Sequence, residues 1–478
     1  MEKIILGRLL SAVYFLLPTF SFPQSCSTWS ATHQSDIAST CNQAVMTMMH
    51  DELNRPYLYI ANKEAGLKIY DISAIATPSL AATVPINLYD SLHVMNVSQS
   101  GNYLYLAIGN HFNSTQKSGM AIVDVTNPIA PTVTDFYELA ASTGGSGIVK
   151  AEGNYAYLGA MGNGLIVLDI TTKSNIVFMS QFKPDINWPV NNPTASLYNA
   201  RGMEVKNSIV YLCFDAGGIR IVNCTNKSVP RETGRWCNPV MYTPLNHPKA
   251  YNNLVKNDTL LYVTVDYAGM EVLDVSDTSN ITMTGWWNPY NAPNNNWFTS
   301  PSHANEIAYH DNCQLVYIST GKSDMMVVDV SNPAQPDSCN FYGGVSNNIG
   351  TWGIGFIKSN YQLYLSYICT LGIPFASNWT GVKLFNLSVG CVLGGTEDPD
   401  LPEINISPVP AKNLITVSLK DNYSLSILTV ENVLGQTFHP SFQHSGNKAE
   451  VDVSELNSGC YFLKVNFEGK QFTKMFMK

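Results

Sequence analysis

The stretch Gly269–Asp277, GMEVLDVSD, decides the fold because the chain repeats it in near copies along most of its length. Each copy is a run of aliphatic residues, usually after a glycine, that ends in an aspartate or asparagine followed two positions later by a serine or threonine. The closing residues are Asp71, Asp124, Asp169, Asn223, Asp274, Asp329 and Asn386. Self-similarity at a steady interval is typical of a repeat architecture.

A second landmark, a tyrosine between aliphatic residues, precedes each copy: Tyr59, Tyr105, Tyr157, Tyr211, Tyr262, Tyr317 and Tyr364. The tyrosine run and the aliphatic run read as two strands joined by a short turn, and apolar segments on either side supply two more. Four short strands in each unit predict a propeller blade. We therefore expect an all-β fold, a seven-bladed β-propeller, over residues 26–393.

The aspartate or asparagine that closes each unit has a structural interpretation. Its side chain can accept hydrogen bonds from nearby backbone N–H groups and so hold the turn between the third and fourth strands. A metal role is the alternative, but these residues recur once in each unit with no second ligand beside them. We therefore predict turns, and neither a metal nor a cofactor.

The units resemble the LVIVD repeat, a propeller-forming repeat of bacterial and archaeal surface proteins. The segments Ala200–Asn226 and Gly153–Thr171 carry the resemblance most closely, and it extends over roughly Val45 to Leu387. The resemblance implies a propeller in an extracellular setting. The resemblance implies no catalytic activity or binding chemistry, because the family has none in common.

The N-terminal segment 1–25 reads as a signal peptide, because Lys3 and Arg8 precede an apolar run, Leu9–Leu17. A lipid-bearing Cys26 is the alternative. No other segment is long and apolar enough to predict a transmembrane helix. The net charge of −9 gives no basic footprint, so we expect no nucleic-acid partner.

The end of the chain differs from the repeats. After a polar linker, 394–403, residues 404–478 alternate apolar and polar positions in short runs, which predicts a small β-sandwich. The pieces ISPVPAKNLITVSL, VENVLGQTF, VDVSELNSGCYFLKV and KQFTKMFMK resemble the type A C-terminal sorting domain of the type IX secretion system of Bacteroidota. The resemblance implies contact with that machinery, and a location secreted from, or anchored on, a Gram-negative cell. An ordinary adhesion-type sandwich is the alternative.

Ten cysteines in an exported chain make disulfides possible. Cys224 with Cys237, and Cys313 with Cys339, are the pairs that would join neighbouring strands of one repeat. Little strand-like sequence follows Asn386, so residues 26–42 are a candidate for the missing outer strand of blade 7.

Insertions predict where a partner binds. The interval from the tyrosine to the closing residue is 12 in five units, but 19 in the second and 22 in the seventh. The interval from a closing residue to the tyrosine of the next unit is 33–35 residues for three connections and 39–43 residues for three others. In an up-and-down blade these lengthened segments share one face, and long loops on a rigid scaffold are where binding is expected.

Two sets of residues are candidates for ligand binding. Trp188, Trp297 and Trp379 lie in the insertions, where they would either stack on a saccharide or peptide or pin the loops to the disc. Arg201, Glu204, His303 and Glu306 lie near the starts of strands predicted to line the central channel. A polar mouth there would bind a small anion or a metal, or simply solvate the channel.

The sequence favours a surface binding or adhesion module, with a saccharide or protein ligand, over an enzyme. It contains no nucleophile elbow, no His-Glu-x-x-His and no phosphate loop. Propellers do host enzymes, and spatial pairs of carboxylates are invisible in a sequence. A hydrolase or lyase with its active site at the channel mouth therefore stays open as the alternative.

Overall fold

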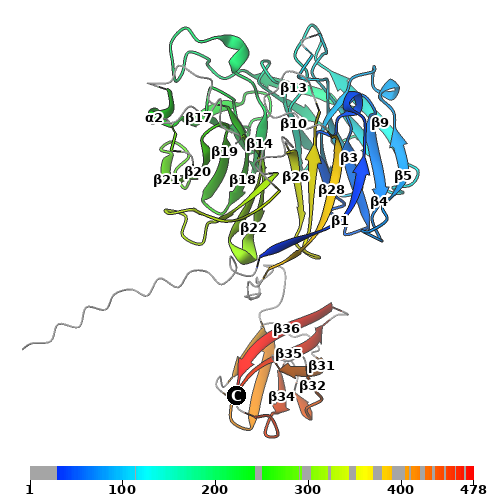
Figure 1. The fold of residues 1–478 in the computed structure, drawn as a ribbon, viewed down its shortest axis with the longest axis vertical. Coiled ribbons are helices and arrows are strands. Elements are labelled where there is room, and N and C mark those ends of the chain that lie inside the picture. The colour runs from blue at the N-terminus through cyan, green and yellow to red at the C-terminus, as the bar shows by residue number, and fades with distance from the viewer. Residues whose placement is uncertain are drawn as a thin grey trace, which may run out of the picture. The chain divides into compact units, whose positions relative to one another are not determined.

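The computed structural model describes residues 29–478, except 114, 243–249, 290, 293–302, 321–323, 344–350, 370–378, 390–403, 408–410, 420–425, 433–435, 446–447, 458 and 468–469. The chain divides into two compact units, Met1–Cys391 and Val392–Lys478 (Figure 1). The predicted signal peptide, the predicted linker and Trp297 lie outside the described residues.

Within the described residues, the first unit contains seven antiparallel four-stranded sheets, the blades of a β-propeller. Blades 1 to 3 are β2 (Met48–His50), β3 (Tyr57–Ala61), β4 (Leu67–Asp71) and β5 (Ser79–Val84); β6 (Val94–Ser100), β7 (Tyr103–Ile108), β8 (Gly119–Asp124) and β9 (Thr132–Glu138); β10 (Ile148–Glu152), β11 (Tyr155–Gly159), β12 (Leu165–Asp169) and β13 (Val177–Phe182). Blades 4 to 6 are β14 (Gly202–Lys206), β15 (Ile209–Cys213), β16 (Ile219–Asn223) and β17 (Arg231–Trp236); β18 (Tyr251–Asn257), β19 (Leu260–Val265), β20 (Gly269–Asp274) and β21 (Thr282–Trp287); β22 (Ala304–His310), β23 (Leu315–Thr320), β24 (Met325–Asp329) and β25 (Asp337–Tyr342).

Blade 7 takes its outer strand from the other end of the chain. It consists of β26 (Thr351–Ile357), β27 (Gln362–Tyr367), β28 (Gly381–Ser388) and β1 (Ser30–Ala38), and β1 pairs antiparallel with β28. The prediction that residues 26–42 supply this strand is confirmed. A disulfide between Cys41 and Cys369 fastens the same closure.

The first strands of the blades form a closed ring. Each contacts the first strand of the next blade, and β26 contacts β2. The repeated tyrosine lies on the second strand of each blade and is buried at every position, because the blades pack their faces against one another there. Short helical segments are confined to connections: η1 (Cys41–Gln43), η2 (Ile86–Leu88), η3 (Ala195–Leu197), α2 (Pro239–Tyr242) and η5 (Asp311–Cys313). Among the described residues, no helix has the length and apolar character needed to cross a membrane.

Six of the seven closing residues hold turns in the way their chemistry suggests. In each, a side-chain oxygen accepts a hydrogen bond from the backbone N–H two residues on, as Asp169 does from Thr171 at 2.8 Å. The same bond occurs at Asp71, Asp124, Asn223, Asp274 and Asp329. The turn predicted at Asn386 is wrong, because Asn386 lies inside β28, between Gln362 of β27 and Thr32 of β1.

The cysteine pairing also differs in part from expectation. Cys224 and Cys237 are buried thiols rather than partners in a disulfide, so that predicted pair is wrong. They belong to different packing clusters on either side of blade 4, which explains why adjacency along the repeat does not bring them together. Cys313 and Cys339 both take part in disulfide bonds.

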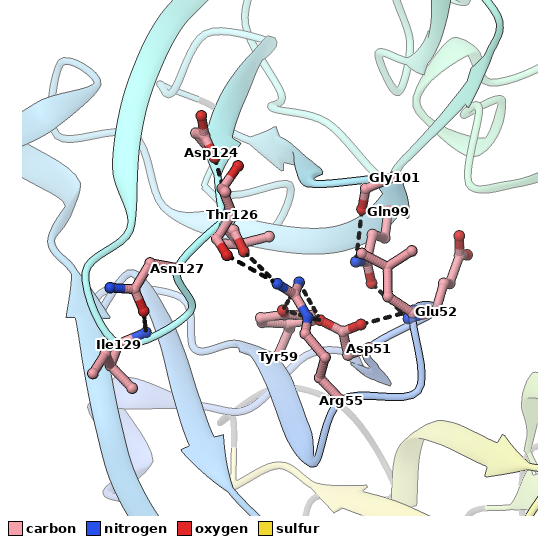
Figure 2. Close-up of polar contacts among 12 residues, drawn as sticks. Asp51, Glu52, Arg55, Tyr59, Gln99, Gly101, Asp124, Thr126, Asn127 and Ile129 are labelled. Atoms are coloured by element: carbon pink, nitrogen blue, oxygen red, sulfur yellow. Dashed lines mark hydrogen bonds and ion pairs between the residues drawn. The ribbon is translucent and has the colours of Figure 1, made fainter.

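A buried ionic network clamps blade 1 to blade 2 (Figure 2). The Asp51 carboxylate is fully buried and accepts hydrogen bonds from Nε and Nη2 of Arg55, at 2.8 and 2.5 Å, and from the Tyr59 hydroxyl. Nη1 of Arg55 donates to the carbonyls of Val125 and Thr126, directly after β8 of blade 2, at 2.9 and 3.2 Å. The buried charge is therefore paired, which is the condition for tolerating it in a core.

The second unit is a small β-sandwich of two four-stranded antiparallel sheets. One consists of β29 (Ile404–Ser407), β30 (Leu414–Leu419), β34 (Lys448–Asp452) and β33 (Phe442–Ser445), the other of β32 (Thr437–Phe438), β31 (Ser426–Asn432), β35 (Cys460–Phe467) and β36 (Lys470–Met477). Residues of both sheets, including Ile415 and Val451 from one and Val430 and Leu463 from the other, share one core.

Candidate binding face

One face of the propeller carries the long connections. In an antiparallel blade, the connection between the second and third strands lies at the same end as the connection to the next blade. This end, which we call the loop face, includes 109–118 in blade 2 and 183–201 between blades 3 and 4; of the connection between β27 and β28 in blade 7, only 368–369 and 379–380 are among the described residues. The opposite end, the turn face, has connections as short as 101–102 and no longer than the seven residues 125–131 in blade 2.

The inserted segment 109–118 of blade 2 reaches the start of the first strand of blade 7. The rings of His111 and Phe112 lie with their centroids 6.4 and 5.5 Å from Trp352, the second residue of β26. Within the segment, the side-chain oxygen of Gln116 accepts a hydrogen bond from the backbone N–H of Asn110 at 2.7 Å, and it also accepts one from the backbone N–H of His93 at 3.2 Å. Trp352 is buried, whereas Phe112 is 38% exposed.

Arg201 completes this arrangement from blade 4. It precedes β14, and its guanidinium carbon lies 5.4 Å from the centroid of the Trp352 ring. Cation–π contacts of this kind fix the plane of an arginine side chain. Three blades thus bring His111, Phe112, Arg201 and Trp352 together at the loop-face end of the ring of first strands, and we call these four residues the axial cluster.

His111 contributes no positive charge to the axial cluster. Burial lowers the pKa of its imidazole to about 3, and the nearby charge of Arg201 lowers it further. Its Nδ1 lies 3.2 Å from the carbonyl oxygen of Ser146. The positive charge of the axial cluster therefore resides on Arg201.

Two carboxyl groups border the axial cluster, one from blade 4 and one from blade 5. Asn199 donates to Oδ2 of Asp215 at 2.9 Å. Burial raises the pKa of the Asp215 carboxyl to about 6, while the charge of Arg201 and the hydrogen bond from Asn199 act in the opposite direction. The negative charge of Asp266 also raises the pKa of Asp215, so the two carboxyl groups are near enough to interact.

His303 pairs with the second of these carboxyl groups. Its Nδ1 lies 2.6 Å from Oδ1 of Asp266, and its ring packs edge to face against Tyr267, with centroids 4.3 Å apart. His303 is almost fully buried. An aspartate that orients a histidine is an arrangement found in general acid–base catalysis.

Glu204 and Glu306 lie on the first strands of blades 4 and 6, beside Lys150 of blade 3. Lys150 Nζ donates to Glu204 at 2.9 Å, and Asn253 donates to Glu306. Burial acts to lower the pKa of Lys150, but Glu204, Glu306 and Glu52 together raise it above its usual value. Burial raises the pKa of Glu306, against the influence of Asn253, Arg201 and Lys150. Glu306 thus interacts with Arg201, and Lys150 interacts with both glutamates.

The tryptophans in the insertions pack against the scaffold. The Trp188 ring lies 4.8 Å from the guanidinium of Arg220 and 4.9 Å from that of Arg235. Arg220 is fully buried and donates to the Trp188 carbonyl at 3.0 Å. Trp379 packs edge to face against Tyr367, with centroids 5.3 Å apart. In these two residues the loop-pinning alternative is therefore the one the contacts favour.

Sequence reasoning missed the residues that form the axial cluster apart from Arg201. The signal for His111 and Phe112 is the length of their insertion, which predicts a binding loop but not the side chains that the loop delivers. Trp352 and Asp215 carry no local signal, because their position at the end of the ring depends on closure of the whole propeller. Within the described part of the chain, no group of three or more His, Cys, Asp or Glu side chains is arranged to hold a metal ion.

Family models of known proteins match segments of both units. Residues 405–478 match the family model of the secretion system C-terminal sorting domain. The LVIVD repeat model matches five segments: 55–85, 93–138, 143–183, 259–288 and 314–342. These fall in blades 1, 2, 3, 5 and 6, so the segment 200–226 of blade 4, one of the two that carry the resemblance most closely, is not among the matches.

Solved structures with a similar architecture have very different sequences. The WD40 repeats of RRP9 share 10% identity and a TM-score of 0.54, over 77% of this chain and 99% of that one. The structure of U3-55K shares 9% identity and a TM-score of 0.53, over 76% of this chain and 99% of that one. The β-propeller domain of Myceliophteria thermophila Cps50 (Swd1) shares 11% identity and a TM-score of 0.52, over 75% of this chain and 100% of that one. At this identity the likeness shows the fold alone. No curated protein matches the chain.

The fold and the matched models define the class as an exported β-propeller. More particularly, the chain is an LVIVD-repeat propeller with a secretion system C-terminal sorting domain, which directs it to secretion or to attachment at the outer cell surface by the type IX system.

Proposed function

We propose that this exported propeller is a binding module whose extracellular ligand, a saccharide or a protein, contacts the loop face. The observation that carries the proposal is the axial cluster, in which an inserted loop of blade 2 delivers a partly exposed aromatic ring beside an arginine. Rigid scaffolds present binding residues in this way, on connections that the scaffold itself does not need.

The loop face carries exposed apolar side chains that a ligand can cover. Leu88, Phe112, Val190 and Val240 are between 37% and 49% exposed and all lie in connections at the loop face. Leu53, Ile129 and Val229 on the turn face are between 47% and 59% exposed, so exposure alone does not distinguish the two faces. Each of the four loop-face residues belongs to a different connection, so a ligand that spans them would contact several blades at once.

The experiment compares the two faces of the full chain on saccharide and peptide arrays. A cysteine is introduced at Leu88 on the loop face or at Ile129 on the turn face, which are 49% and 59% exposed, and each is coupled to a polyethylene glycol maleimide. The proposal predicts saturable binding that is lost only when position 88 is coupled. Cys213, Cys224 and Cys237 are buried, and wild type treated with the same reagent gives the background labelling.

Two results of this experiment would overturn the proposal. The first is binding that is blocked at position 129 and unaffected at position 88. The second is the absence of binding to any saccharide or peptide by correctly folded, uncoupled protein.

A hydrolase or lyase is the second candidate function, and the Asp266–His303 pair favours it. The Asp215 carboxyl lies near this pair, and because burial raises its pKa to about 6 it can exchange a proton near neutral pH. The test is incubation of the chain with each saccharide it binds, followed by measurement of new reducing or unsaturated ends. Product formed by wild type but not by a folded His303→Ala variant would support an enzyme, and no product would remove it.

A further inference from the structure

We propose that Arg201 is the recognition group for a sugar carboxylate, so that the axial cluster takes a uronic acid unit of an acidic saccharide. The carboxylate pairs with the guanidinium of Arg201, and the sugar ring packs on Phe112. This inference rests on the function proposed above and names the ligand class for the same face.

Packing orients the guanidinium of Arg201, and none of the described residues pairs with its N–H groups. Its plane is held by Trp352, yet within the described residues its side-chain nitrogens have no hydrogen-bond or ion-pair partner. By contrast, Arg220 donates four hydrogen bonds, to Gly217, Asp185, Trp188 and Glu232, and Arg55 donates to Asp51. A fork of N–H donors that packing has already oriented is suited to bidentate pairing with a carboxylate.

Phe112 supplies the second contact. Its ring and the Arg201 guanidinium lie 5.5 and 5.4 Å from the Trp352 centroid, so an apolar and a cationic group both border the same indole. A uronic acid carries its carboxylate directly on the sugar ring, so one unit presents an anion and a partly apolar ring face together. Aromatic faces pack well against such partly apolar surfaces.

Among the described residues, Lys63 and Lys150 are further cations near the axial cluster, and each is paired with a carboxylate. Lys63 lies 2.9 Å from Glu64, Lys150 lies 2.9 Å from Glu204, and His111 is uncharged. The charge of Asp215 opposes an anion at Arg201, because the two groups interact. A sugar unit with one carboxylate beside Arg201 is therefore favoured over a unit that carries several anionic groups, such as a multiply sulfated sugar.

The test is isothermal titration of the full chain with oligogalacturonate, and with a neutral galactose oligosaccharide of equal length. The inference predicts binding of the acidic oligosaccharide and a loss of at least about tenfold in affinity for Arg201→Gln, the usual cost of removing a charged hydrogen-bond donor. Arg201→Lys keeps the charge but not the fork and should recover only part of that loss.

Arg235→Gln is the matched control. Arg235 also stacks on a tryptophan, Trp188, but lies in blade 4 away from the axial cluster. Its removal should leave the affinity for oligogalacturonate unchanged, and the unfolding temperature of each variant confirms that it is folded. Phe112→Ala should weaken binding of the acidic oligosaccharide without abolishing its dependence on Arg201.

The possible outcomes separate this inference from the proposed function. Equal affinities of wild type and Arg201→Gln for oligogalacturonate would overturn the inference. Binding of the neutral oligosaccharide alone, or of a peptide through its C-terminal carboxylate, would also overturn it while leaving a binding module at the loop face. Failure to bind any array member would overturn both.

Discussion

At the scale of single residues, the molecule stabilises buried charge by complete pairing, and Asp51 is the clearest example. Burial acts to raise the pKa of its carboxyl, but hydrogen bonds from Arg55, Tyr59 and the backbone of Leu53 outweigh burial and hold the pKa below its usual value. The same residue joins blade 1 to blade 2 through Arg55 (Figure 2). The negative charge of Asp51 therefore stabilises the folded propeller.

Asp51→Asn is predicted to lower the free energy of unfolding by about 3 kcal/mol at pH 7, since Arg55 would lose its buried partner. Because the folded pKa is depressed, this contribution is present above a pH of about 4 and is lost as the pH falls through the folded pKa. Urea unfolding should therefore show a gap between wild type and variant that narrows below pH 4. Asp90→Asn, at a carboxylate that is 62% exposed, is the control with little effect.

Asp215 is predicted to make ligand binding depend on pH. The charged or titratable groups that face it are Arg201, Asp266 and the thiol of Cys213, whose pKa burial raises well above its usual value. Since the Asp215 pKa is about 6, its opposing charge disappears below that pH. The affinity for oligogalacturonate should be higher at pH 5 than at pH 7.5 by about fivefold, or about 1 kcal/mol, and Asp215→Asn should remove the difference. A difference that persists in the variant would exclude Asp215 as its source.

The residue scale is also where prediction from sequence was weakest. Arg201 was identified because it precedes a first strand, but Phe112 and Trp352 meet only when blades 2 and 7 are brought around the ring. The sequence left open whether Trp188 stacks on a ligand or pins its loop, because its packing partner, Arg220, lies 32 positions later. Long-range contacts between blades leave no local pattern, so residue roles at the axis could not be read from one repeat.

At the scale of strands and blades, prediction from sequence succeeded for a physical reason. The tyrosine, the aliphatic run and the closing aspartate each have a local role in every blade, so each leaves a mark at the same spacing. The exception is informative. Asn386 matches the pattern, but its blade borrows β1 as the fourth strand, and no turn is needed after β28.

The ring closure includes a disulfide that spans nearly the whole propeller. Cys41 and Cys369 are 328 residues apart, which no spacing rule could pair. The double variant Cys41→Ala, Cys369→Ala is predicted to lose about 2–5 kcal/mol of stability, because a crosslink over a long loop restricts the unfolded chain. Denaturant unfolding measures the loss. An unchanged midpoint would mean that the pairing of β1 with β28 alone fixes the closure.

At the scale of the whole molecule, the chain combines an export address with a rigid display scaffold. The sorting domain and the propeller are separate compact units, each with its own core. A chain that ends at residue 393 is therefore predicted to unfold at the same temperature as the propeller transition of the full chain in scanning calorimetry. A lowered temperature would show that the propeller depends on the second unit.

The central claim is that a ligand contacts the loop face, and hydrogen–deuterium exchange of the full chain tests it most directly. Exchange is compared with and without a ligand identified on the arrays. The account predicts slower exchange in the loop-face segments 85–93, 109–118 and 139–147, with no change in the turn-face segments 51–56, 125–131 and 170–176. Protection confined to the turn-face segments would contradict it.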